Sequence, residues 1–185
     1  MLQLLEIAKK FLNEADIKSD GVLVDFTMGN GYDTLYLSEL VPSGKVYAFD
    51  IQEDAITNTK KRLDENGVTA KVQLIHDSHA NAKKYIDTEI DGGMFNLGYL
   101  PGGDKSIHTM HESTISAVKD AISILKKGGI LVISVYPGHE EGKREGEALI
   151  EMLSEYDKRL YWISRFYLVN SPDSPFIITV EKYNK

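Results

Sequence analysis

The sequence contains no cysteine among its 185 residues. This absence excludes disulfide bonds, thiolate metal sites and cysteine nucleophiles, and it is typical of a protein in a reducing compartment. Long apolar runs are also missing, because no stretch approaches the roughly 20 residues that a membrane-spanning helix needs. The N-terminal residues 1–6 become charged too early for a signal peptide. We therefore expect a cytoplasmic protein that has no membrane partner.

Positive charge is scarce, with 21 Lys and Arg against 28 Asp and Glu and a net charge of −7. This balance argues against nonspecific coating of nucleic acid, because such binding depends on cations that neutralise phosphates. A compact RNA can still be met by a local basic patch, so charge alone does not identify the substrate. The length suits one domain over residues 1–185, and we see no repeat or linker that divides it.

Apolar segments that fit strands alternate along the chain with segments that fit amphipathic helices. Residues 1–20 are expected to contain a lead-in helix, which Asp20-Gly21 ends. Strands are expected at 22–26, 45–49, 70–75, 94–97 and 130–135, with helices at 35–40, 53–65, 109–126 and 141–156. This order predicts an α/β fold in which helices cover both faces of a parallel sheet.

The last two strand-like segments, 161–169 and 176–181, are joined by only residues 170–175. A connection this short cannot contain a crossover helix, so the two strands should pair antiparallel. A mostly parallel seven-stranded sheet that ends in an antiparallel hairpin resembles the Rossmann-like fold of class I methyltransferases. A plain dinucleotide-binding fold lacks that hairpin.

A glycine-containing loop, Asp-Phe-Thr-Met-Gly-Asn-Gly-Tyr-Asp, occupies residues 25–33 after the first expected strand. Its glycines would let the backbone turn tightly and approach a ligand, although they are also compatible with a simple turn. Thr34 stands where a dinucleotide site has its third glycine, and Asp33 would repel a pyrophosphate. The loop therefore favours a cofactor with cationic groups, such as S-adenosylmethionine. Its candidate cofactor-binding residues are Asp25, Gly29, Asn30, Gly31 and Asp33.

An acid follows the second expected strand, since Asp50 comes about 20 positions after Gly31, near the spacing at which such folds place an acid on ribose hydroxyls. Gln52 could then face the adenine edge. Asp50 could also cap the helix that begins at Glu53, and both roles are compatible.

The third expected strand leads into His76-Asp-Ser-His79. Asp77 could accept a hydrogen bond from the adenine amino group, and Ser78 or His79 could supply further polar contacts. His76 and His79 are spaced like a metal-binding pair, but no third ligand follows at a suitable spacing, so we expect no metal. Together, three strand ends would place a glycine loop and two acids along one edge of the sheet.

The fourth expected strand ends in a loop rich in glycine and polar residues, 95–104, and loops of this kind usually carry function. The amide of Asn96 could hold a substrate N–H, and Tyr99 could stack on a planar ring. The arrangement resembles the Asn/Asp-Pro-Pro-Tyr motif of amino-group methyltransferases, with Leu97-Gly98 in place of the two prolines.

Three segments, 25–34, 96–107 and 136–139, together resemble the small bacterial family long labelled rRNA methylases. Characterised members methylate the aminomethyl group of 5-aminomethyl-2-thiouridine at the tRNA wobble position. The resemblance implies S-adenosylmethionine as the cofactor and a tRNA anticodon loop as the partner. Such an amine must lose a proton before it attacks, and Asp104 and His139 are the candidate acceptors. Turn formation by Asp104 and helix capping by His139 are the alternatives, and no role is assigned to His108 or His111.

Other functions remain as alternatives. An rRNA or small-molecule methyltransferase would use the same cofactor loop, and the acidic charge favours the latter. A nucleotide-binding protein without catalysis, or an NAD-dependent oxidoreductase, could be built on the same sheet. A homodimer is left open. Basic residues that could meet an RNA backbone are Lys9, Lys10, Lys105, Lys143, Arg144 and Arg165.

Overall fold

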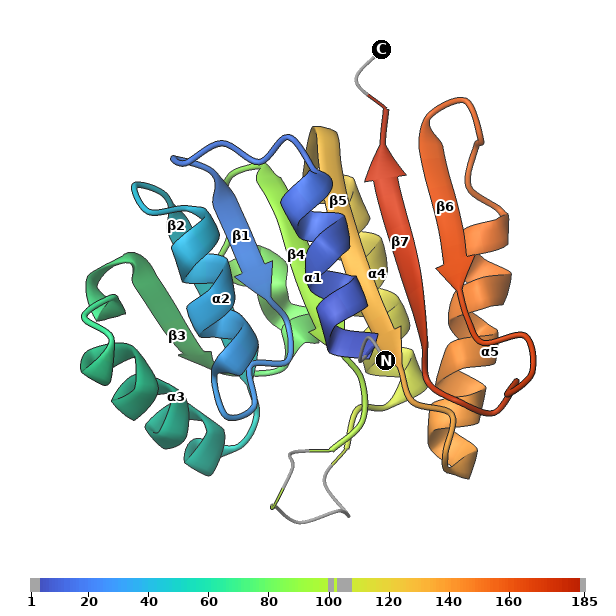
Figure 1. Ribbon diagram of the computed structural model, residues 1–185, viewed down its shortest axis with the longest axis horizontal. Helices are drawn as coiled ribbons and strands as arrows, with labels where there is room; N and C mark the ends of the chain where they lie inside the picture. Colours follow the sequence, from blue (N-terminus) through green and yellow to red (C-terminus); the bar gives the residue numbers. More distant parts are fainter. Residues whose placement is uncertain (1–3, 100–101, 103–107, 184–185) are drawn as a thin grey trace.

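The computed structural model describes residues 4–99, 102 and 108–183. Seven strands form one sheet in the order β3-β2-β1-β4-β5-β7-β6 (Figure 1). The strands are β1 (Val22–Asp25), β2 (Lys45–Asp50), β3 (Val72–His76), β4 (Ile90–Asn96), β5 (Leu125–Val135), β6 (Tyr161–Phe166) and β7 (Phe176–Lys182). The helices are α1 (Leu4–Glu14), α2 (Tyr32–Leu40), α3 (Glu53–Glu65), α4 (His111–Ile124) and α5 (Glu140–Ser154), with 3-10 helices η1 (Thr69–Lys71) and η2 (His79–Lys84).

The pairing of the strands confirms the expected class of fold. Strands β1 to β5 pair in parallel, whereas β7 runs antiparallel to both β5 and β6. Strand β7 is inserted between β5 and β6, so the hairpin returns into the sheet instead of extending its edge. This is the mostly parallel sheet with an antiparallel C-terminal pair that the sequence predicts.

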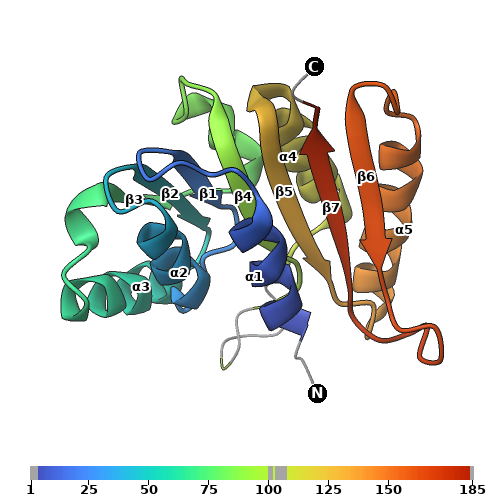
Figure 2. The same ribbon diagram turned by 45° about the horizontal axis from the view of Figure 1, so that its top comes forward.

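Helices cover both faces of the sheet, as Figures 1 and 2 show. On one face, apolar residues of α1 and α2, including Ala8, Leu12 and Leu37, pack on strand residues such as Leu23 and Val132. On the other face, η2, α4 and α5 enclose the second apolar cluster. Because successive strand residues point to opposite faces, neighbours in β1 and β5 divide between these two clusters. A sheet that is buried on both faces explains why its strands are almost continuously apolar.

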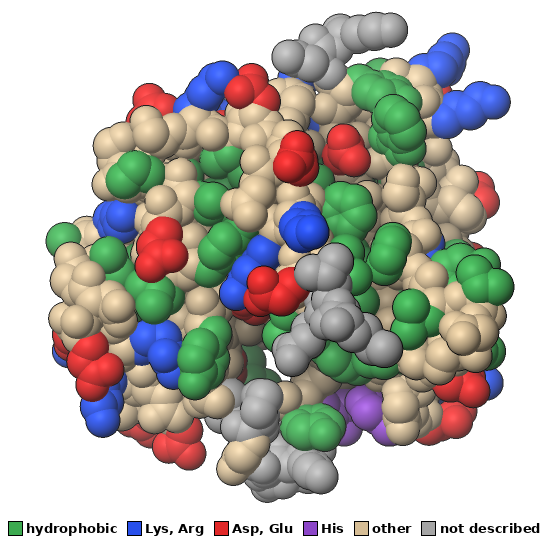
Figure 3. Space-filling model, in the orientation of Figure 1, with side chains coloured by type: hydrophobic (Ala, Val, Ile, Leu, Met, Phe, Trp, Pro, Cys, Tyr) green, Lys and Arg blue, Asp and Glu red, His purple; other side chains and the backbone are tan. Residues whose placement is uncertain are grey.

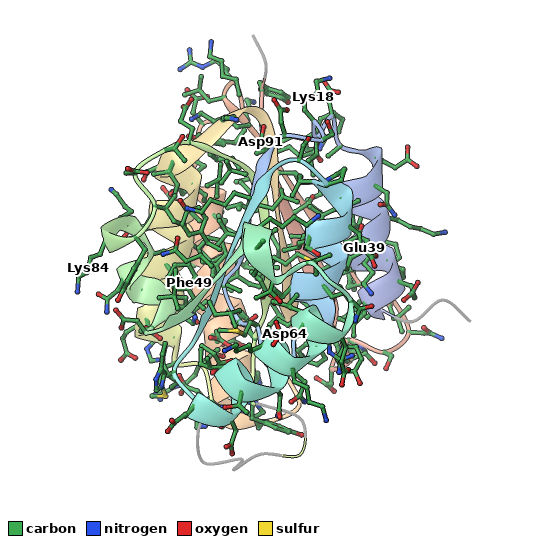
Figure 4. The ribbon with its side chains drawn as sticks, turned by 90° about the vertical axis from the view of Figure 1, so that its left-hand side faces the viewer. Lys18, Glu39, Phe49, Asp64, Lys84 and Asp91 are labelled. Carbon is green, nitrogen blue, oxygen red and sulfur yellow. The ribbon has the colours of Figure 1, made fainter. Side chains whose placement is uncertain are left out.

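Three phenylalanine rings stack on one another where β1, β2 and β4 end. The rings of Phe26 and Phe95 lie 4.1 Å apart and almost parallel, and Phe49 follows at 6.2 Å from Phe26. All three side chains are buried, and Figure 4 shows Phe49 inside the molecule. Close packing of this kind leaves little freedom to the loops that leave these strands.

Several boundaries differ from the sequence-based expectation. Strand β4 begins at Ile90 and β5 at Leu125, each several residues before the expected start, and the pairing shifts register between Ile90 and Gly92. Gly128 lies inside β5 with a left-handed φ of 79°. The pattern of apolar residues did not predict this irregularity in the strand. The 3-10 helix η2 was not expected. Among residues 4–99 and 108–183, none of the helices combines the length and apolar character that crossing a bilayer requires.

Candidate cofactor and acceptor site

The expected site residues gather at one edge of the sheet, where the parallel strands end. Strand β1 pairs with β2 on one side and with β4 on the other, so the chain order reverses at β1. Ligands of open α/β sheets bind in the crevice outside the carboxyl ends at such a reversal. In Figure 1 this edge is at the bottom, where the loops after β1, β2 and β4 lie. Figure 3 shows histidine side chains at the surface near the same edge.

The loop after β1 depends on its two glycines. Their φ angles are 51° at Gly29 and 78° at Gly31, and no described non-glycine residue has a positive φ. A Cβ on Gly31 would also lie 2.8 Å from the side chain of Thr59 on α3. Thr59 donates a hydrogen bond from its hydroxyl to the carbonyl oxygen of Gly29 at 3.0 Å. The loop is therefore held closely against α3.

Asp25 supports the loop from inside the protein. Its side chain is fully buried, and it accepts hydrogen bonds from the Thr34 hydroxyl at 2.6 Å and the Thr27 N–H at 3.1 Å. Burial, with the charge of Asp33 nearby, raises the pKa of Asp25 to about 7. The expectation that Asp25 touches a cofactor directly does not fit a carboxyl with no exposed surface. Thr34, which the sequence presented only as a missing glycine, is the donor that holds it.

Asn30 also faces the protein. Its side-chain oxygen accepts a hydrogen bond from the amide of Asn58 at 3.0 Å, and its backbone carbonyl accepts one from Arg62 at 2.8 Å. The guanidinium of Arg62 in turn lies over the ring of Tyr32, 3.6 Å from its centroid. These contacts fasten the outer side of the glycine loop to α3.

Asp50 lies at the end of β2 and reaches across to the glycine loop. Its carboxylate accepts hydrogen bonds from the N–H of Gly29 and the N–H of Gln52, both at 3.0 Å. Burial raises the pKa of Asp50, while these N–H groups oppose the rise. Gln52 is the residue that precedes α3, and its side chain makes no capping hydrogen bond. Asp50 therefore lies against the glycine loop, and Gln52 lies two residues further on, at the start of α3.

Asp77 follows β3 as a half-exposed carboxylate that three donors hold in place. It accepts hydrogen bonds from the Asn81 amide, the Tyr85 hydroxyl and the Ser78 N–H. The hydrogen bonds from Asn81 and Tyr85 hold the pKa of Asp77 below its usual value. Ser78 caps η2 by accepting from the Ala80 N–H at 3.2 Å. A fixed, charged acceptor at the end of β3 suits an amino group of a ligand.

The two histidines near β3 point to different partners. The Nε2 of His76 lies 2.9 Å from the carbonyl oxygen of Ile51, whereas the Nδ1 of buried His79 lies 3.1 Å from that of Phe26. Burial lowers the pKa of His79 to about 4, so this ring is neutral at physiological pH. The Nε2 of His79 is buried and has no partner among the described residues. Within the described structure, His79 thus offers one unused polar atom near Phe26, where the glycine loop begins.

Asn96 connects the end of β4 to the glycine loop. Its N–H donates to the hydroxyl of Thr27 at 2.7 Å, and its side-chain amide donates to the carboxylate of Asp33. Burial raises the pKa of Asp33, and the charge of Lys9, 4.0 Å away, opposes that rise. The Oδ1 of Asn96 is buried without a partner in the described part of the chain. An orphaned acceptor costs free energy unless a ligand donates to it, so this oxygen marks a place for a donor.

The loop after β4 is closed at its base by a pair of chain segments. Tyr99 and His108 form an antiparallel bridge, and the N–H of Thr109 donates to the carbonyl of Gly98 at 2.9 Å. The N–H of Gly98 donates in return to the Thr109 hydroxyl at 2.8 Å, and that hydroxyl donates to buried Glu145 at 3.0 Å. Tyr99 is 43% exposed, as a stacking residue needs to be. Asp104 and Lys105 lie outside the described residues.

His139 caps α5, which was the alternative role considered for it. Its Nδ1 accepts a hydrogen bond from the N–H of Gly142 at 3.0 Å. In the neutral ring the remaining proton must then be on Nε2, so this histidine can donate a hydrogen bond but has no free lone pair. Its ring centroid lies 5.8 Å from that of His108. The lone pair of the neutral His139 ring is therefore used in the cap, and His108, to which the sequence assigned no role, lies beside it.

The candidate RNA-contacting cations that the structure describes lie on three different elements, α1, α5 and β6. Lys9 lies beside Asp33, and the guanidinium of Arg165 packs 4.1 Å above the ring of Phe176. Lys143 and Arg144 are exposed in the first turns of α5, directly after His139. They are thus the described cations that are both exposed and next to the candidate acceptor site.

Comparison with known proteins places this geometry in a family. A family model described as Putative rRNA methylase matches residues 46–182. The chloroplastic tRNA (mnm(5)s(2)U34)-methyltransferase of Arabidopsis thaliana is 36% identical in an alignment 181 residues long, which covers 91% of this chain and 66% of that protein. The chain therefore spans slightly less than two thirds of that relative's length.

Two solved structures are similar to this chain over almost its whole length. A Clostridium thermocellum protein of the same description is 38% identical, with a TM-score of 0.94 over 98% of each chain. A Streptococcus mutans protein solved in complex with SAH is 36% identical, with a TM-score of 0.88 over 98% of this chain and 99% of that one. The expectations of a class I methyltransferase fold and of a methyltransferase family are confirmed, and the chain belongs to the Putative rRNA methylase family.

Proposed function

We propose that this protein is an S-adenosylmethionine-dependent methyltransferase that methylates a primary amine on RNA, namely the aminomethyl group of 5-aminomethyl-2-thiouridine at the tRNA wobble position. The supporting observation is the placement of Asn96, whose amide nitrogen contacts Asp33 beside the glycine loop and whose Oδ1 is a buried, unused acceptor. A cofactor at the loop and an N–H donor at Asn96 would then be neighbours. The name of the Arabidopsis relative points to the same substrate.

The residues at the edge fit this cofactor. Gly29 and Gly31 bring backbone close to the ligand, and Asp50 supplies a carboxylate where a ribose diol is expected. Asp33 and Asp50 provide negative charge, which suits an ammonium and a sulfonium better than a pyrophosphate. When bound, S-adenosylmethionine supplies a methyl group that its sulfonium activates toward nucleophiles. No part of the chain needs to form a covalent bond in such a transfer.

The protein's own contribution is position. Asn96 would accept a hydrogen bond from the substrate amine and fix the direction of the nitrogen lone pair. Tyr99, exposed at the base of the loop, would stack on the uracil ring, as aromatic side chains do with splayed-out RNA bases. Orientation of two reactants in this way can account for much of a rate enhancement.

Nucleoside mass spectrometry tests the proposal. Purified protein is incubated with labelled S-adenosylmethionine and tRNA that carries unmethylated 5-aminomethyl-2-thiouridine, and the label should appear in the methylaminomethyl nucleoside. A metabolite extract serves as the parallel substrate, because the net charge of −7 favours a small-molecule methyltransferase as the second candidate. Label in metabolites and none in tRNA would select the second candidate.

Two variants divide the roles of the site. Asp50→Ala should weaken S-adenosylhomocysteine binding by about 10- to 100-fold, the effect of losing hydrogen bonds to a charged group. Asn96→Ala should leave that affinity within a few-fold and lower kcat, because its free oxygen faces the acceptor. Calorimetry and initial rates measure the two quantities separately, and an equal loss of cofactor affinity in both variants would contradict this division.

A further inference from the structure

Two histidine rings meet where the loops after β4 and β5 approach each other. The rings of His108 and His139 lie 5.8 Å apart at an interplanar angle of 67°. The backbone of His108 is fixed by its bridge to Tyr99, and the next residue, Thr109, is bonded to Gly98. The bridge therefore places the backbone of His108 beside Tyr99, three residues after Asn96, which ends β4.

The two rings differ in what they can accept. His139 uses the lone pair of Nδ1 to cap α5. Within residues 4–99 and 108–183, no hydrogen bond or ion pair occupies the ring of His108, so no described partner uses the lone pair of its neutral imidazole. Of the two, His108 is the ring that can take a proton without breaking a structural contact.

A buried carboxylate lies within electrostatic range of His108. Glu145, on α5, is almost fully buried, and its carboxylate is held by the hydroxyls of Thr109 and Thr114. Burial raises the pKa of Glu145, and a positive charge on His108 acts in the opposite direction. A cation at His108 and an anion at Glu145 therefore stabilise each other. Among the described residues, the ring of His139 lies beside His108, and the carboxylate of Glu145 acts on it at longer range.

We infer that His108 accepts the proton that the substrate's ammonium group must lose before it can attack, an assignment that rests on the proposed amine methylation. The proton moves from the substrate nitrogen to a ring nitrogen of His108, and this leaves a neutral amine with a free lone pair. That pair then forms the nitrogen–carbon bond as the carbon–sulfur bond breaks, with the bonding electrons remaining on sulfur. His108 releases its proton to solvent afterwards.

The pH dependence of tRNA methylation tests this assignment with His108→Gln and the matched variant His139→Gln. Loss of a positioned base should lower kcat at pH 7 by about 100-fold or more in His108→Gln, with a smaller effect in His139→Gln. The rate of His108→Gln should keep rising with pH, because solvent must then deprotonate the amine, and added imidazole should restore part of it. S-adenosylhomocysteine affinity, measured by calorimetry, should match the wild type in both variants.

The possible results separate the two levels of inference. An active wild type together with a His108→Gln variant of unchanged kcat and pH profile would overturn the role of His108 and leave the proposed function intact. A loss confined to His139→Gln would assign the proton to His139. A wild type that binds S-adenosylhomocysteine but transfers no methyl group to tRNA would overturn the proposed function and the role of His108 with it.

Discussion

At the scale of single residues, backbone conformation and burial explain why particular residue types occur at Gly31 and Asp25. Gly31 is required twice, by its left-handed φ of 78° and by the side chain of Thr59, 2.8 Å from where a Cβ would be. Asp25 is required as a buried hydrogen-bond acceptor for Thr27 and Thr34, although the sequence predicts that an acid at the end of a strand contacts a ligand. Neither distinction can be made from residue types alone, because the partner in each case is decided by how the loop folds.

Gly31→Ala should destabilise the protein more than Gly67→Ala. Both glycines have a positive φ, 78° and 68°, but a Cβ on Gly67 would meet nothing within 4 Å. Gly67→Ala should therefore cost about 1–2 kcal/mol of unfolding free energy for the backbone alone, and crowding against Thr59 should add about 1–3 kcal/mol at Gly31. Urea unfolding of the two variants gives the difference, and equal losses would show that the contact with α3 is unimportant.

Asp25 should make stability fall as the pH rises toward neutrality. The folded protein holds the Asp25 proton up to about pH 7, whereas an ordinary aspartate loses it near 3.8. Between these values the folded state binds more protons, so unfolding becomes easier with increasing pH, by at most about 1.4 kcal/mol per pH unit from this group. Asp25→Asn should remove that share of the slope. Denaturant unfolding at pH 5 and pH 7.5 measures it, and identical slopes in both proteins would refute the role of burial.

At the scale of elements, most strands and helices follow from the alternation of apolar segments. Strand β2 and helix α3 were expected almost at their observed bounds, because each has a clear period and clear ends. The early start of β5 was not expected. Its first part, with Lys126, Lys127 and the glycines after them, forms an irregular, partly exposed stretch of strand. The contact of His108 with His139 depends on α5 meeting the loop after β4, a tertiary contact that no local pattern encodes.

The base of the loop after β4 offers a test at this scale. Thr109→Val and Thr114→Val each remove one hydroxyl that donates to Glu145, at 3.0 and 2.5 Å respectively. Both should lower the unfolding free energy by about 1–3 kcal/mol. Only Thr109→Val also deprives the Gly98 N–H of its acceptor, so only this variant should raise KM for tRNA. Steady-state kinetics, measured where both variants are fully folded, give the two KM values for tRNA. An equal rise in KM would mean that the bonds to Glu145 affect tRNA binding only by stabilising the fold.

At the scale of the whole molecule, the sheet separates a structural end from a functional one. Asp91, at the start of β4, accepts hydrogen bonds from the Val22 N–H and from Lys126, both far from the carboxyl ends of the strands. Figure 4 shows Asp91 and Lys18 together at this opposite end. The topology made this division predictable, because parallel strands bring all their carboxyl ends to one edge. The sequence did not predict which side chains at that edge would form hydrogen bonds with the protein itself, as Asp25 and Asn30 do.

Electrostatic contact with tRNA should be slight and local. Replacing both Lys143 and Arg144 by Gln should raise KM for tRNA several-fold without changing kcat, and should reduce the slope of log affinity against log salt by about two. The matched control is Lys18→Gln with Lys158→Gln, two exposed cations away from the site. Filter binding at several salt concentrations measures the slopes, and equal effects of the two pairs would place the RNA elsewhere.

The amide of Asn96 has one further consequence, which concerns the order in which the two substrates bind. A donor that engages its Oδ1 polarises the same amide and strengthens the bond from its nitrogen to Asp33. On the proposed function, binding at the acceptor side would then stabilise the cofactor side, and thermodynamic reciprocity would require the converse by an equal factor. Protein saturated with S-adenosylhomocysteine should thus bind tRNA more tightly than the free protein, and Asn96→Ala should abolish this cooperativity.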